Sequence, residues 1–175
     1  MPHRAGTRTL NRSRHRYHVT TGAALICGLA LSLGSALAQE PNWAGEPSYG
    51  SHHLSAGFTP DPWQQSLQAG GSSQVNGTLG PNCTGYIMAS APDIDLHYSA
   101  GNMPLYITVE SSADTTLVIN APDGRWYCND DFIGLNPLVM FQNPSSGMYN
   151  IWVGVHGSSE LQPATLKITE LNPMR

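Results

Sequence analysis

The feature that most constrains the fold is a series of short runs, rich in β-branched and aromatic residues, that begins near residue 77. Prolines fall between the runs, where a missing backbone donor costs least. No segment is long enough, or regular enough in its apolar spacing, to be assigned as a helix. The runs cover residues 85–89, 94–98, 105–110, 115–120, 125–128, 138–142, 148–155 and 164–171. Short strands at this spacing predict an all-β fold, a β-sandwich of about eight strands.

Apolar positions alternate along two of these runs, as they do when one face of a strand is buried. They are Leu105, Ile107 and Val109 in the first run and Tyr149, Ile151, Val153 and Val155 in the second. If these side chains form the core, Trp152 points to the opposite face, and the same alternation separates Tyr127 from its neighbours. Because aromatic side chains often carry binding energy, Trp152 and Tyr127 are predicted binding residues. The alternative is that an arm of the chain covers Trp152.

Residues 114–131 indicate a hairpin followed by an acidic loop. Ala121-Pro122-Asp123-Gly124 has proline and glycine where a type I turn favours them. The return strand ends in Asn129, Asp130 and Asp131, which supply adjacent oxygen-bearing side chains. Calcium takes six to eight oxygen ligands, so these residues and Asp123 predict an assembled calcium site. The alternative is that the acidic side chains accept backbone hydrogen bonds and hold the turn.

The first 38 residues predict a secretory signal peptide. A segment with five arginines precedes an apolar stretch at 23–33, and Ala36-Leu37-Ala38 matches a small-residue cleavage site. The stretch is short for a membrane span, although an uncleaved anchor is the alternative. We expect export by the general secretory route, cleavage after Ala38, and a secreted or periplasmic protein.

Cleavage makes the chain strongly acidic. It leaves three basic side chains against twelve acidic ones, a formal net charge of −9. Such a charge repels phosphate backbones and anionic lipids, which disfavours nucleic acid and membrane surfaces as partners. It attracts divalent cations or basic partners.

Two cysteines, Cys83 and Cys128, remain after cleavage, because Cys27 leaves with the signal. An even pair in an exported protein predicts a disulfide, with free thiols or a metal site as alternatives. Residues 39–76 are rich in Gly, Ser, Pro and Gln without a regular period, which indicates a linker or an irregular arm laid on the domain. Within this arm, His52 and His53 point to opposite sides if the chain is extended, so together they make a poor ligand pair.

The order of motifs along residues 77–171 resembles the bacterial pre-peptidase C-terminal domain. The motifs are Asp93-x-Asp95, Leu105-Tyr106-Ile107-Thr108-Val109, Asp114-Thr115-Thr116-Leu117-Val118-Ile119, Pro122-Asp123-Gly124, Asn129-Asp130-Asp131 and Ser146-Gly147-Met148-Tyr149-Asn150-Ile151-Trp152-Val153. The resemblance implies a jelly-roll-like β-sandwich over residues 77–175, of a kind appended to secreted proteases. Related collagenase modules bind calcium and substrate, which implies calcium as a ligand here too.

No motif predicts catalysis. A hydrolase needs a nucleophile, a base and an orienting group, and neither His97 nor His156 lies in a motif that implies a base. We therefore expect a non-enzyme, an exported binding or accessory module that recognises a protein, peptide or glycan. The alternatives are a small secreted structural protein without a specific ligand and an unrecognised hydrolase.

Overall fold

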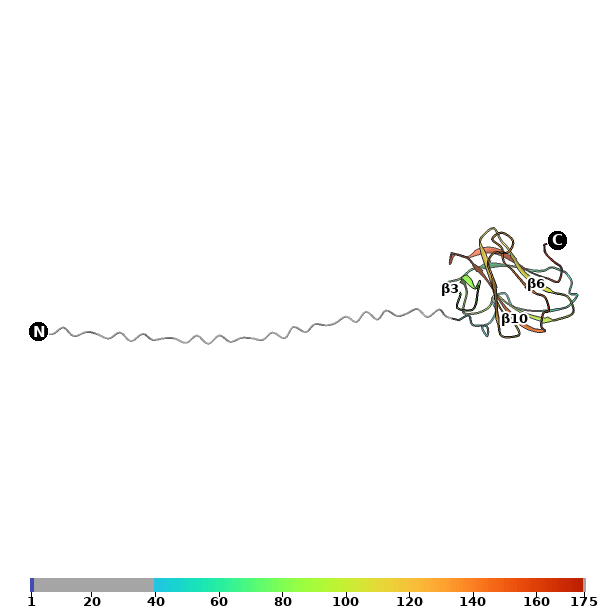
Figure 1. Ribbon diagram of the computed structural model, residues 1–175, viewed down its shortest axis with the longest axis horizontal. Helices are drawn as coiled ribbons and strands as arrows, with labels where there is room; N and C mark the ends of the chain where they lie inside the picture. Colours follow the sequence, from blue (N-terminus) through green and yellow to red (C-terminus); the bar gives the residue numbers. More distant parts are fainter. Residues whose placement is uncertain (2–39, 175) are drawn as a thin grey trace. The chain divides into compact units, whose positions relative to one another are not determined.

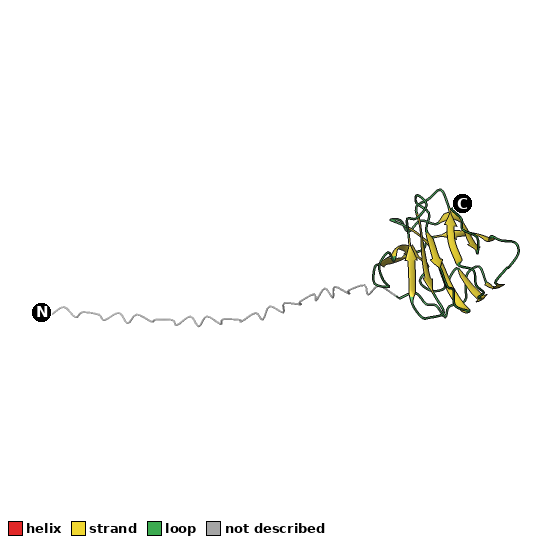
Figure 2. Cartoon of the chain, turned by 45° about the vertical axis from the view of Figure 1, so that its right-hand side comes forward, coloured by secondary structure: helices red, strands yellow, loops and turns green. Residues whose placement is uncertain are grey.

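Eleven strands make up the fold in this computed structural model, which describes Met1 and residues 40–174. The strands are β1 (Ser51–Ser55), β2 (Trp63–Ala69), β3 (Ser73–Asn76), β4 (Thr84–Ile87), β5 (Ile94–Ser99), β6 (Leu105–Glu110), β7 (Thr115–Asn120), β8 (Trp126–Asn129), β9 (Leu138–Phe141), β10 (Gly147–Val155) and β11 (Gln162–Thr169). The described residues contain no helix (Figure 2). Eight of the strands, β4 to β11, lie where the sequence predicts strands, so the all-β prediction is confirmed.

The strands form a seven-stranded and a four-stranded sheet. The seven-stranded sheet is built around β10, the longest strand, which is labelled in Figure 1. The first part of β10 pairs with β5, the second with β7, and Val155 at its end pairs with β4. Outside these, β1 pairs with β5, β3 with β4 and β8 with β7. The four-stranded sheet has the order β2-β11-β6-β9.

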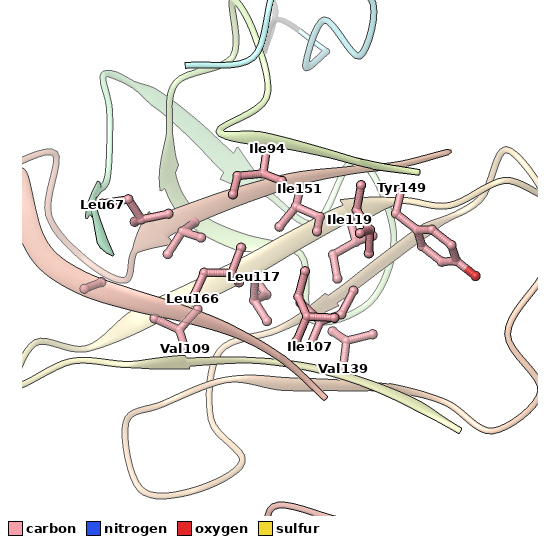
Figure 3. Packing of buried hydrophobic residues seen from close by; sticks show 14 of the residues in the cluster. Leu67, Ile94, Ile107, Val109, Leu117, Ile119, Val139, Tyr149, Ile151 and Leu166 are labelled. Carbon is pink, nitrogen blue, oxygen red and sulfur yellow. The ribbon is translucent and has the colours of Figure 1, made fainter. Parts of the chain in front are cut away.

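The main core lies between the two sheets, and it contains the alternating residues that the sequence predicts. Figure 3 shows side chains of both sheets meeting, among them Ile119 and Ile151 from one sheet and Ile107 and Leu166 from the other. The predicted positions on β6 and β10 are all at most 3% exposed. Strict alternation on strands that bury one face therefore locates this core.

Residues 40–76 are not an irregular arm, which corrects the sequence prediction. Strand β1 pairs in parallel with β5, β2 pairs with β11, and β3 pairs with β4, so this segment contributes to both sheets. Strand β2 does alternate, because Leu67 and Ala69 are buried while Gln64, Ser66 and Gln68 are exposed. The polar Gln65 at an inward-facing position interrupts the apolar signal, and β1 carries a single aliphatic residue.

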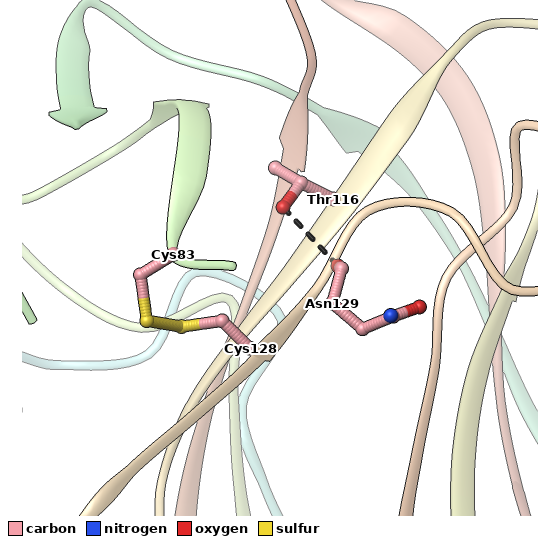
Figure 4. Close-up of a disulfide and its surroundings, with 4 residues drawn as sticks. All are labelled: Cys83, Thr116, Cys128 and Asn129. Atoms are coloured by element: carbon pink, nitrogen blue, oxygen red, sulfur yellow. Dashed lines mark hydrogen bonds between the residues drawn. A yellow bond between two sulfur atoms is a disulfide. The ribbon is translucent and has the colours of Figure 1, made fainter. Parts of the chain in front are cut away.

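A second, smaller core lies on the other face of the seven-stranded sheet. It consists of Val75, Cys83, Ile87, Val118 and Trp152, with Leu79, Trp126 and Cys128 packed at its margin. The predicted disulfide is confirmed: Cys83 and Cys128 are bonded, with Cα atoms 4.9 Å apart (Figure 4). It links the turn before β4 to β8 across this second core.

The predicted signal peptide, with Cys27, falls in the part of the chain outside the described residues. Within those described, no helix is long and apolar enough to cross a membrane.

Candidate functional site

The predicted calcium ligands lie at two ends of one strand. Asp123 occupies the turn before β8, where its Oδ1 accepts a hydrogen bond from Arg125 N at 3.0 Å and its Oδ2 accepts one from the Tyr127 hydroxyl at 2.8 Å. Slight burial acts to raise the pKa of Asp123, but these hydrogen bonds outweigh it and lower that pKa. The carboxylate of Asp123 therefore stabilises its own hairpin.

Asn129, Asp130 and Asp131 follow at the far end of β8. Asn129 Oδ1 accepts a hydrogen bond from Leu138 N at 2.9 Å, and its backbone carbonyl accepts one from Thr116 Oγ1 at 3.3 Å, the bond drawn in Figure 4. Asp131 is exposed. Between residues 40 and 174, no group of three or more His, Cys, Asp or Glu side chains is placed to hold a metal ion. Asp123 and the other three residues therefore do not form one site, and calcium at 129–131 alone stays a prediction.

The two aspartates of the Asp93-x-Asp95 motif, whose oxygens could also serve a cation, are structural. Asp93 Oδ2 accepts a hydrogen bond from Val153 N at 2.7 Å, and Asp95 Oδ1 accepts one from Asn150 Nδ2 at 2.7 Å. Burial raises the pKa of Asp93 to about 7, against the lowering effect of the Val153 bond. Both carboxylates are buried, and both bond to strand β10.

The two aromatic residues predicted to bind a partner, Trp152 and Tyr127, differ from each other in burial. Trp152 does point away from the main core, but it is 0% exposed in the second core and donates from Nε1 to Met88 O at 3.1 Å. Its assignment to an exposed binding surface is therefore corrected, because the segment of β3 and β4 covers it. Tyr127 is half-buried, and its ring packs edge-to-face on the ring of Phe141 with the centroids 4.9 Å apart. The hydrogen bond from its hydroxyl to Asp123 raises the pKa of that hydroxyl.

An apolar surface lies beside Tyr127 on the β8–β9 loop, residues 130–137. Phe132, Ile133 and Leu135 are 49%, 46% and 53% exposed, although they lie within four positions of one another. Met140 on β9 and Met174 near the C-terminus are also exposed, and with Phe132 they line a depression of about 330 Å³. Exposed apolar side chains are ordinary singly, but a contiguous group of them marks an interaction surface.

Hydrogen bonds hold this loop in shape. The amides of Phe132 and Ile133 both donate to Asn136 O, at 3.1 and 3.0 Å, and Asn136 N donates to Ile133 O at 3.2 Å. Gly134 takes a φ of 63°, which glycine adopts without steric cost. Thr115 N donates to Leu135 O at 3.1 Å, which fixes the loop to β7. The apolar side chains are therefore presented by an ordered backbone.

Carboxylates surround the apolar loop. Asp130 and Asp131 directly precede Phe132. Asp114 directly precedes Thr115, whose backbone amide donates to Leu135 O. Asp114 Oδ2 and Asp130 Oδ2 lie 3.5 and 3.8 Å from His156 Nδ1, which is the nearest basic group to either of them. This end of the sandwich therefore combines exposed apolar area with negative charge.

A groove of about 640 Å³ lies elsewhere, on the outer face of the seven-stranded sheet. Trp43, which is 54% exposed, and the half-buried Trp126 line it together with Asn120 and Asn150. Asn150 Nδ2 donates to Trp43 O at 3.1 Å, so the segment before β1 is tied to the sheet. Tryptophan faces next to amide side chains suit a ligand with both apolar and hydroxyl surfaces.

The histidines do not form a nucleophile-base pair. His52 contacts the Tyr49 carbonyl, His53 and His97 stack on each other, and His156 lies next to carboxylates. None of these rings hydrogen-bonds a serine within residues 40–174. A serine hydrolase needs that bond to activate its nucleophile.

Sequence reasoning singled out Asp130 and Asp131 of the β8–β9 loop but missed its apolar surface, although a signal was present. Phe132-Ile133-Gly134-Leu135 is an apolar segment outside every predicted strand, directly after two aspartates. An apolar run in a loop has no core position to fill, and this marks it for a different role.

Comparison with known proteins gives no family for the chain. No family model matches the sequence, and no curated protein matches it. Among solved structures, the chain is similar to a periplasmic inhibitor of g-type lysozyme from Aeromonas hydrophila, with 15% sequence identity and a TM-score of 0.40. The similar region covers 68% of this chain and 96% of that chain. Identity and TM-score are too low for this likeness to carry an inference about function.

Proposed function

We propose that the protein is an exported, non-catalytic binding module that binds a basic protein through the β8–β9 loop. The observation that carries the proposal is the exposure of Phe132, Ile133 and Leu135, each near half of its surface, on a loop held by backbone hydrogen bonds. Leaving such side chains in water costs free energy that a partner recovers by covering them. An ordered loop also loses little conformational entropy on binding.

Charge selects the class of partner. The loop is flanked by Asp114, Asp130 and Asp131, and the chain after the predicted signal has a formal net charge of −9. Negative potential around an apolar centre attracts basic proteins and speeds their association, and the effect falls with salt. A basic protein therefore fits this surface better than nucleic acid or an anionic membrane. Membership of the pre-peptidase C-terminal family stays a proposal, supported by the positions of strands β4 to β11.

Site-specific photo-cross-linking tests the proposal. A photoreactive residue replaces Leu135 in the exported protein, and a matched control replaces Leu161, which is equally exposed at 55% but lies far along the chain before β11. We expect a discrete cross-linked basic protein from position 135, reduced at high salt and missing from position 161. The same products from both positions, or none from position 135, would overturn the proposal.

A second candidate function is glycan binding in the outer groove, and Trp43 favours it because this side chain is 54% exposed. The flat apolar face of a sugar ring packs on an aromatic ring, and Asn120 in the groove lining offers an amide group for its hydroxyls. Titration with oligosaccharides of glucose and N-acetylglucosamine, read by tryptophan fluorescence, separates the two functions. Saturable quenching that the Trp43→Ala variant abolishes supports the groove, and unchanged fluorescence eliminates it.

A further inference from the structure

Strand β1 forms one edge of the seven-stranded sheet, and one side of it faces away from its neighbour β5. The two strands are parallel and in register along the whole of β1. Because Asp95 N donates to Gly50 O at 3.3 Å, the residues of β1 that bond β5 are His52 and Leu54. The residues whose backbone N–H and C=O point away from β5 are Ser51, His53 and Ser55.

This edge is open to solvent and has no cap. Ser51, His53 and Ser55 are exposed, and their backbone groups have no hydrogen-bond partner within residues 40–174. Native sheets protect such an edge with Lys, Pro, a bulge or a covering segment. The sequence of β1, Ser-His-His-Leu-Ser, contains neither Lys nor Pro, and its register with β5 has no bulge. The outer side of β1 is therefore a template for another strand.

The other edges of the two sheets are capped or shorter. On β2, the Tyr49 hydroxyl accepts a hydrogen bond from Gln68 N, and Ser66 O accepts one from the neighbouring glutamine side chain, both at 2.8 Å. On β9, Leu138 N donates to Asn129 Oδ1 at 2.9 Å. Strands β3 and β8 have four residues each, against five in β1. Among the described strands, β1 therefore offers the longest uncapped edge.

We propose that β1 pairs with β1 of a second copy of this chain, antiparallel and about a two-fold axis at His53. The segment is suited to pairing with itself, because Ser51 then faces Ser55 of the second copy and His52 faces its Leu54. Opposite residues in a hydrogen-bonded antiparallel pair exchange two bonds, so the outward residues of the two copies make about six bonds in all.

Charge and packing favour a second copy as the occupant. No Asp, Glu, Lys or Arg lies in β1 or lines the depression of about 400 Å³ beside it, so a charged peptide gains no ion pair here. On the inner side, Leu54 packs against the main core, and pairing brings it against His52 of the second copy. The ring of His52 is held on Trp63, with centroids 4.6 Å apart. Both strands are already ordered, so pairing costs little conformational entropy.

This pairing does not depend on the β8–β9 loop or its proposed partner. Strand β1 ends the seven-stranded sheet beyond β5, whereas β8 ends it beyond β7, so a dimer leaves the loops of both copies accessible. Salt separates the two interactions. Copies with a formal net charge of −9 repel each other, so dimer formation should strengthen as salt screens the charge, while binding of a basic partner should weaken.

Sedimentation equilibrium of the exported protein tests the pairing. His53→Pro removes the outward donor and places a ring on the edge, but it spares the bonds to β5, because His53 N does not face β5. Gln74→Pro is the matched control on the edge of β3, where the bond from Gly77 N to Cys83 O leaves the Gln74 N–H pointing outward. We expect the wild type and the control to dimerise, and His53→Pro to associate roughly 10- to 100-fold more weakly, because both bonds across the axis are lost.

Cysteine cross-linking tests the register, and it decides the matter if His53→Pro fails to fold. Opposite Cα atoms in a hydrogen-bonded pair are about 5.5 Å apart, which a disulfide can span. The thiols of His53→Cys should therefore join two copies, as should a mixture of Ser51→Cys and Ser55→Cys. Ser55→Cys alone is the control, because its two thiols would lie four residues apart along the pair, about 13 Å. Cys83 and Cys128 do not compete, since they are bonded to each other.

Three results would overturn the proposal. The first is a monomer at every protein and salt concentration. The second is wild-type association of His53→Pro when this variant has the circular dichroism spectrum of the wild type. The third is cross-linking of Ser55→Cys alone to the same extent as His53→Cys, which would show random collision instead of pairing in register.

Discussion

The two faces of the seven-stranded sheet differ in what they do for the molecule. The inner face packs on the four-stranded sheet through β5, β7 and β10, where every second residue belongs to the main core. The outer face is divided: part is covered by β3 and β4 over Trp152, and part carries the groove lined by Trp43 and Trp126. The inner face therefore supplies stability, while the outer face and the β8–β9 loop carry the surfaces that we propose for ligands.

The largest effect should come from the covered part of the outer face. Replacing Trp152, which is 0% exposed, by Ala removes the centre of the second core and should cost about 3–5 kcal/mol of unfolding free energy. Trp43→Ala is the matched control, since Trp43 is 54% exposed and should change stability by only about 0.5 kcal/mol. Urea denaturation of both variants measures the difference. Equal losses would show that the outer face is not divided in this way.

The second effect is a pH dependence of the unfolding free energy that originates at Asp93, which is buried directly before β5. Asp93 has its pKa raised by burial from 3.8 to about 7, so the native state keeps a proton that the unfolded chain releases near pH 4. This contribution to stability is fully present below about pH 4 and is lost as the pH rises through about 7.

Asp93→Asn keeps the acceptor for Val153 N but does not titrate. Relative to this variant, the wild type should lose up to about 4 kcal/mol between pH 4 and pH 8, at about 1.4 kcal/mol per unit of pKa shift. Thermal or urea unfolding across this range measures the difference. Parallel pH profiles for the two proteins would contradict a raised pKa at Asp93.

The main core and Trp152 show which parts of the structure could be predicted from sequence. Alternation placed Ile107, Ile151 and Val153 in the main core because that signal is local to each strand. It also placed Trp152 on the opposite face, but its burial depends on Val75 and Ile87, which reach it only through the pairing of β3 with β4. Local patterns do not contain such long-range coverage.

The disulfide and the candidate ligands show the same limit of local sequence patterns. The disulfide followed from counting cysteines, whereas Asp123 and Asn129 seemed adjacent by hairpin position and lie at opposite ends of β8. His53 was expected in an irregular arm, and it stacks on His97 through the parallel pairing of β1 with β5. A contact made between separate strands depends on register, which one sequence does not specify.

A smaller effect is expected from calcium if it binds at Asp130 and Asp131. Calcium at a hundred times its dissociation constant would add about 2.7 kcal/mol to the unfolding free energy, and Asp130→Asn/Asp131→Asn should remove the gain. Asp123→Asn is the control, because the structure places Asp123 at the other end of β8. An unchanged melting temperature between a chelator and millimolar calcium would contradict calcium binding at the loop.

Changes in the β8–β9 loop should alter the unfolding free energy least and the affinity for the proposed partner most. Polar replacement of Phe132, Ile133 and Leu135 removes side chains that are about half exposed and outside both cores, so unfolding free energy should shift by only about 0.5 kcal/mol. This separates the β8–β9 loop from the outer face at Trp152.

Isothermal titration of the partner cross-linked at position 135 tests the central claim most directly. The proteins compared are the wild type, Phe132→Ser/Ile133→Ser/Leu135→Ser, and a control, Leu161→Ser/Leu171→Ser, in which the replaced side chains are 55% and 60% exposed. We predict that the loop variant binds about 100-fold more weakly, a loss of about 2.7 kcal/mol, while the control retains wild-type affinity. Equal affinity of the loop variant and the control would contradict a binding role for the β8–β9 loop.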